Sequence, residues 1–92
     1  MKKELVEIYS DATNQAVLKH PDRNYPGVLI QGDDLYSFCQ SLDEACKSIK
    51  ENNYETAYVE INEIRNALWE KLIHYKVVLA EHHIDLPFSE TP

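Results

Sequence analysis

Three short runs of apolar and alternating residues open the chain and predict β-strands. Residues 5–9 (Leu-Val-Glu-Ile-Tyr) alternate as a half-buried strand does. Residues 16–19 (Ala-Val-Leu-Lys) follow a polar turn, and residues 27–31 (Gly-Val-Leu-Ile-Gln) follow a loop punctuated by prolines. A small antiparallel sheet of about three strands, arranged as a meander, is the simplest structure for this part of the chain.

A helical pattern follows the third run. Asp33 or Asp34 is suited to cap this helix, which we expect to end near Glu51. The apolar residues recur at three- and four-residue spacing and form one stripe: Leu35, Phe38, Cys39, Leu42, Cys46 and Ile49. The opposite face is polar: Tyr36, Gln40, Asp43, Glu44 and Lys47. The pattern predicts a helix whose stripe, including Leu42 and both cysteines, is buried in the core.

A second, longer helix is predicted over residues 54–82. Asn52 and Asn53 supply the turn before it, and Glu55 is placed to complete a capping box. One apolar stripe runs along the helix: Tyr54, Ala57, Ile61, Ile64, Leu68, Leu72, Tyr75 and Leu79. A second apolar patch lies about 100–180° around the helix: Val59, Trp69, Ile73, Val77 and Ala80.

A helix with two apolar faces must bury both of them or present one to a partner. In the first case, the first helix covers one apolar face and the sheet covers the other. In either case we expect the two helices to form an antiparallel hairpin that packs on one face of the sheet, in a single α+β domain spanning residues 1–92. In the second case, the face of Trp69, Ile73 and Val77 contacts a partner protein or a second copy in a homodimer.

Length and composition favour one small globular domain. The chain has 92 residues, 43% of them hydrophobic and 27% charged, so it can hold a modest core without help. Cys39 and Cys46 are about 10 Å apart on a helix, too far for a disulfide. No apolar run approaches the ~20 residues that span a bilayer. The basic start lacks an apolar segment after it, so we expect a cytoplasmic location.

The net charge of −7 is unevenly distributed. Residues 1–32 carry four basic and four acidic side chains, whereas residues 33–92 carry five basic and twelve acidic ones. An acidic surface repels nucleic acid and anionic lipid and attracts a basic protein. The candidate partner-binding residues are the acidic stripe of the second helix with two carboxylates of the first: Glu60, Glu63, Glu70, Asp43 and Glu44.

No catalytic motif, metal-ligand set or cofactor fingerprint is visible. The serines lack a nucleophile elbow, and two glycines do not make a phosphate loop. Glu70 and His74 would supply only two metal ligands. One loop is harder to explain, because it holds Arg23 and Tyr25 and leads to Asp33. Arg23 either pairs internally with an aspartate at the helix start or contacts a ligand or partner.

The chain resembles an uncharacterised family of short bacterial proteins, a domain-of-unknown-function family of about this length. The matching stretches are residues 6–10, 14–18, 25–33 and 82–88, together with Pro21, Arg23, Leu35, Tyr75, Val78 and Leu79. The run Pro-Gly-Val-Leu-Ile-Gln-Gly-Asp is the most specific part. Such proteins usually look glycine-capped after the long helix, whereas this chain has His83 there. The resemblance implies a small standalone bacterial protein and no established activity.

These observations favour a non-enzymatic binding protein. The leading hypothesis is an immunity or antitoxin-like protein that neutralises a basic toxin, because the chain is small, acidic and without catalytic motifs. The alternatives are a small-molecule-binding or regulatory domain that uses the Arg23–Asp33 loop, and a structural homodimer.

Overall fold

The computed structural model describes residues 1–90. Three strands, β1 (Glu7–Ser10), β2 (Val17–Lys19) and β3 (Gly27–Val28), precede two helices, α1 (Gly32–Lys50) and α2 (Tyr54–Glu81). The strands form an antiparallel sheet in the order β1-β2-β3, which confirms the predicted meander and the α+β class. Two compact units can be distinguished: a sheet unit of residues 1–30 and 71–90, and a hairpin unit of residues 31–70. The two units share α2.

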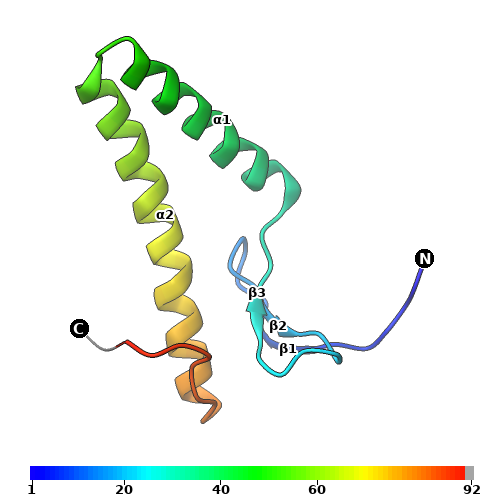
Figure 1. The fold of residues 1–92 in the computed structure, drawn as a ribbon. Coiled ribbons are helices and arrows are strands. Elements are labelled where there is room, and N and C mark those ends of the chain that lie inside the picture. Colours follow the sequence, from blue (N-terminus) through cyan, green and yellow to red (C-terminus); the bar gives the residue numbers. More distant parts are fainter. Residues whose placement is uncertain (91–92) are drawn as a thin grey trace. The chain divides into compact units, whose positions relative to one another are not determined.

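The sheet unit has its core between the strands and the C-terminal end of α2. Val17, Tyr75, Val78 and Leu79 are buried together there. In Figure 1, this end of α2, drawn in orange, lies beside the strands. A bulge in β1 leaves Tyr9 without a partner residue on β2, because Ile8 pairs with Leu18 and Ser10 with Val17. Five partly buried side chains pack around the core: Tyr9, Val28, Leu72, Ile84 and Leu86.

Polar contacts fix the register of α2 in the sheet unit. The Tyr75 hydroxyl donates a hydrogen bond to the Pro26 carbonyl over 2.7 Å. The Ser10 hydroxyl and the His74 Nε2 atom lie 2.9 Å apart, and the Lys71 ammonium donates to the carbonyl of Asn14. Because Lys71, His74 and Tyr75 lie within little more than one turn of α2, these bonds tie one side of the helix to the sheet unit and hold it against rotation about its axis.

Three side-chain contacts attach the chain beyond α2 to the sheet unit. Ile84 and Leu86 pack on the core, and the Lys76 ammonium pairs with the Glu90 carboxylate over 2.7 Å. Phe88, by contrast, is exposed. The tail is therefore held by two apolar side chains and one ion pair.

In the hairpin unit, α1 and the first half of α2 run antiparallel, and the turn at Asn52–Asn53 joins them (Figure 1). The most buried residues are Ala45 and Ala57, 1% and 2% exposed. Since alanine has a very small side chain, its burial means that the neighbouring backbone approaches closely. The helices therefore meet near the turn through small residues.

The largest difference between the prediction and the structure concerns the apolar stripe of the hairpin, which was expected to be buried. Leu42 and Leu68, expected to be core residues, are 46% and 45% exposed. Cys39 and Cys46, expected to be buried, are both free and exposed. The periodicity located the apolar face correctly, and Ile64 of that face is buried, at 8% exposure. The contact at the two alanines nevertheless leaves Leu42 and Leu68 beside the helix–helix contact instead of inside it.

The helix ends also differ from the expected caps. Helix α1 begins at Gly32, so Asp33 and Asp34 lie in its first turn, where their charge complements the helix dipole. The Asn53 carbonyl accepts the first helical bond of α2, from the Ala57 amide, so Glu55 is one residue too early for the predicted capping box. Neither of the two helices combines the length and the apolar character that crossing a bilayer requires.

Candidate functional site

An acidic groove lies in the hairpin unit. It has a volume of about 610 Å³, and residues of both helices line it. The lining residues are Tyr36, Cys39, Gln40, Ser41, Asp43, Glu44, Glu60 and Glu63. On α1, Tyr36, Gln40 and Asp43 are separated by four and three residues, so helical geometry brings them to one face. Glu60 and Glu63 are three residues apart on α2 and supply the second wall.

The electrostatics of the groove favour a positively charged ligand. Four of its eight lining residues are carboxylates, and none is basic. The Oε2 atom of Glu60 is buried and has no hydrogen-bond partner among residues 1–90. A buried acceptor without a partner costs about 1–3 kcal/mol, and more when it is charged. A bound ammonium or guanidinium group would supply the missing donor.

The groove contains four of the five predicted partner-binding residues: Asp43, Glu44, Glu60 and Glu63. Glu70, predicted to belong with them, is exposed further along α2 and does not line the groove. The sequence pattern gave no role to Tyr36 and Gln40, although it placed them on the same polar helix face as Asp43. That shared face was the available signal for them.

The predicted loop residues are divided between the two units. Arg23 and Tyr25 are exposed in the loop between β2 and β3, in the sheet unit, where the Arg23 amide donates to the His20 carbonyl. Asp33 is exposed in the first turn of α1, in the hairpin unit. Pairing of Arg23 with Asp33 therefore stays a prediction.

The second predicted contact surface is the apolar patch on α2. Trp69, Ile73 and Val77 follow one another at four-residue spacing and are each about half exposed, as is Val59. Asn62 and Asn66 occupy the same side of the helix between Val59 and Trp69. The patch is therefore a narrow strip on a single helix, interrupted by amides.

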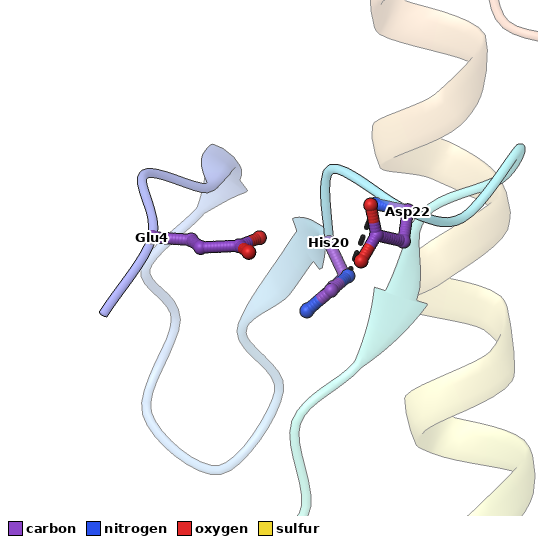
Figure 2. Close-up of side chains that lie close together, drawn as sticks. All are labelled: Glu4, His20 and Asp22. Atoms are coloured by element: carbon purple, nitrogen blue, oxygen red, sulfur yellow. Dashed lines mark hydrogen bonds between the residues drawn. The ribbon is translucent and has the colours of Figure 1, made fainter. Parts of the chain in front are cut away.

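A cluster of possible metal ligands lies in the sheet unit (Figure 2). One ligand atom each from Glu4, His20 and Asp22 lies within 4.8 Å of the others, and all three residues are exposed. The Lys2 ammonium is already 2.6 Å from Glu4 and 3.9 Å from Asp22. The His20 Nδ1 atom accepts the Asp22 amide over 3.1 Å, shown dashed in Figure 2. A zinc ion would need ligand atoms roughly 3.5 Å apart and an imidazole lone pair. We therefore attribute the cluster to pairing with Lys2.

Two tyrosines have raised pKa values, and both are explained by structure. The Tyr9 hydroxyl donates to the Glu7 carboxylate over 2.7 Å, and this hydrogen bond raises the pKa of Tyr9. Burial raises the pKa of Tyr75, whose hydroxyl bonds the backbone. Neither tyrosine lines the groove, so the groove does not gain an acid–base group from them.

The fold and the groove together define a small α+β protein in which a three-strand sheet precedes a helical hairpin with an acidic groove. Residues 1–88 match the family described as "Family of unknown function (DUF6959)", and the chain belongs to that family. This membership confirms the resemblance recognised in the run at residues 25–33. No curated protein and no solved structure matches the chain.

Proposed function

We propose that this protein is a non-enzymatic binding protein whose acidic groove takes up a lysine or arginine side chain of a basic protein partner. The observation that carries the proposal is the groove itself. It gathers four carboxylates without a basic residue and includes the buried Oε2 atom of Glu60, which has no partner among residues 1–90. A charge-assisted hydrogen bond to that atom would be stronger than one between neutral groups.

The charge of the whole hairpin unit supports the same partner class. Residues 31–70 carry nine acidic and three basic side chains, a net charge of −6 out of the total of −7. Such a field speeds the approach of a basic protein and slows that of an acidic one. Nucleic acid and anionic lipid are disfavoured as partners for the same reason.

The more specific form of the proposal is an immunity or antitoxin-like role, in which the basic partner is a bacterial toxin that this protein neutralises. Small size and acidity suit that role, because a compact acidic protein can cover a basic surface of its target. The groove then acts as the anchor point, and the surrounding carboxylates of the hairpin unit steer the encounter.

The test begins with capture of the partner from the native cell, with the intact protein as bait. Association rates are then measured at two salt concentrations for the wild type, Glu63→Lys and Glu70→Lys. The two variants make the same charge change on the same helix, but only Glu63 lines the groove. We expect both to slow association through the long-range field, and only Glu63→Lys to accelerate dissociation as well.

A partner that is acidic, or whose association ignores salt, contradicts the proposal. Equal effects of Glu63→Lys and Glu70→Lys on dissociation would mean that the groove is not the anchor. Loss of binding in Arg23→Ala, with both reversals harmless, would transfer the function to the loop between β2 and β3. A basic partner without toxic activity when expressed alone would contradict the toxin form only.

A further inference from the structure

The hairpin unit exposes a broad apolar surface that the groove does not use. On α1 it consists of Leu35, Leu42 and Ile49. On α2 it consists of Tyr54, Tyr58, Ile61 and Leu68. These seven residues, here called the hairpin apolar face, are 41–63% exposed, and none of them lines the acidic groove. A solvated surface of this kind marks an interaction site more often than scattered single residues do.

The two stripes lie on the same side of the hairpin. Leu35, Leu42 and Ile49 are each seven residues apart, as are Tyr54, Ile61 and Leu68, so each stripe drifts by only about 20° per step. When each helix is viewed from its N-terminus, the stripe lies on the same side of the buried alanine, which is Ala45 on α1 and Ala57 on α2. Because the helices are antiparallel, equal rotation places both stripes on one side.

The exposed area matches what a stable dimer needs. Five half-exposed aliphatic side chains and two tyrosines amount to an apolar area on the order of 500 Å². A standard interface covers about 800 Å² on each partner, and about two-thirds of a homodimer interface is apolar. The hairpin apolar face thus supplies the apolar share of one ordinary interface.

We propose that a second copy of this chain covers the hairpin apolar face, so that two hairpins form a two-fold symmetric four-helix arrangement. A two-fold axis sets the same patch against itself, and an apolar patch is complementary to itself. Stripes with seven-residue spacing are the pattern through which helices pack side by side in bundles. None of the seven residues is charged, so this net acidic protein can dimerise there without opposing carboxylates directly.

The dimer leaves both acidic grooves open, because the face and the groove share no residue. The size of the exposed surface also decides which of the two apolar surfaces of α2 we assign to the dimer. The strip of Trp69, Ile73 and Val77 has three large residues on one helix, whereas the hairpin apolar face has seven on two helices. The wider surface is the one that we assign to the second copy.

The experiment measures the mass of the intact protein in solution by light scattering and sedimentation, under reducing conditions because Cys39 and Cys46 are exposed. We expect wild type to have twice the mass of one chain. Leu42→Glu should raise the dissociation constant of the dimer at least about tenfold. Two matched controls, Lys47→Glu on α1 and Trp69→Glu on the other patch of α2, should leave it unchanged.

A monomeric wild type overturns the proposal, whatever the variants do. A dimer that Trp69→Glu dissociates and Leu42→Glu does not would also overturn it, in favour of the other patch. Helix content is checked by circular dichroism, and if Leu42→Glu loses it, the more exposed Leu35→Glu takes its place, at 53% exposure. Monomeric and folded Leu35→Glu supports the proposal, and dimeric Leu35→Glu contradicts it.

Discussion

The two halves of α2 carry one continuous apolar stripe but bury it very differently. In the sheet unit, Tyr75 and Leu79 of this stripe are 5% and 0% exposed. In the hairpin unit, Ile64 is buried at 8% exposure, but Ile61 and Leu68 on either side of it are each more than 40% exposed. Nothing in the periodicity distinguishes the two halves, so the difference comes from what lies against each of them.

The sheet unit covers the apolar stripe of α2 more completely than α1 does. Strand β2, the bulge at Tyr9 and the tail at Leu86 approach the C-terminal half from several directions, whereas the hairpin contact is centred on Ala45 and Ala57. The charge is divided in the same way, with −6 on the hairpin unit and −1 on the other residues. The two units therefore differ in how fully they bury the stripe and in the charge that they carry.

The largest expected effect is at Leu79. Leu79→Ala should lower the free energy of unfolding by about 2–5 kcal/mol, because it removes a fully buried side chain and leaves a cavity. Leu68→Ala removes a half-exposed side chain of the same stripe and should cost only about 1 kcal/mol. Denaturant unfolding, at concentrations where the chain is monomeric, measures both values. Equal losses would remove the contrast between the two halves.

Tyr75→Phe tests the polar side of the sheet unit. The change removes the 2.7 Å hydrogen bond to the Pro26 carbonyl and leaves that acceptor without its donor. We expect a loss of about 1–3 kcal/mol in the free energy of unfolding. A loss below about 0.5 kcal/mol would show that water replaces the phenol at this carbonyl.

The same residue gives the wild type a pH dependence. Because burial raises the pKa of Tyr75 in the folded state, the unfolded chain loses this proton first as the pH rises. The stability contribution is complete below pH ~10 and is lost above it. The decline of stability in alkali should therefore be shallower in Tyr75→Phe than in wild type.

Glu60→Gln, in the hairpin unit, should raise the free energy of unfolding, whereas the substitutions in the sheet unit lower it. It removes a charge from a buried oxygen without a partner, beside three other carboxylates of the groove. We expect the variant to be more stable by about 1 kcal/mol, with the gain shrinking as salt screens the repulsion. Glu70→Gln, on an exposed part of the helix, is the control and should change stability little. A destabilised Glu60→Gln would mean that the carboxylate has an internal role.

Much of the fold could be predicted from the sequence. Alternation gave the three strands, and the stripes gave both helices to within a few residues at each end. Four of the five predicted acidic residues line one groove because the polar face of α1 and Glu60 and Glu63 of α2 are all set by helical spacing. Glu70 shares that spacing and lies outside the groove, since periodicity fixes a direction around the helix and not a position beside a neighbour.

The exposed core stripe could not be predicted for a related reason. Leu42 and Cys46 have the spacing of buried residues, but burial depends on how closely α1 and α2 approach each other. That approach is set by the small residues Ala45 and Ala57. Caps were missed because Asn52 was available to end one helix or to begin the next. Its φ of 62° shows that it ends α1.

The smallest predicted effect concerns the two helix ends, one in each unit. Asn52 and His83 both have positive φ, 62° and 56°. In each case the next amide bonds a carbonyl five residues back, Asn53 to Ser48 and Ile84 to Leu79, which is the Schellman pattern.

A left-handed conformation costs most non-glycine residues about 1–2 kcal/mol, and asparagine less. We therefore expect His83→Gly to stabilise the protein by about 0.5–1 kcal/mol after the added flexibility of the unfolded chain is deducted. Asn52→Gly should gain nothing, since the Asn52 side chain also accepts the Tyr54 hydroxyl over 2.8 Å. Thermal unfolding of both variants measures the difference, and a destabilised His83→Gly would mean that the imidazole stabilises the fold in its own right.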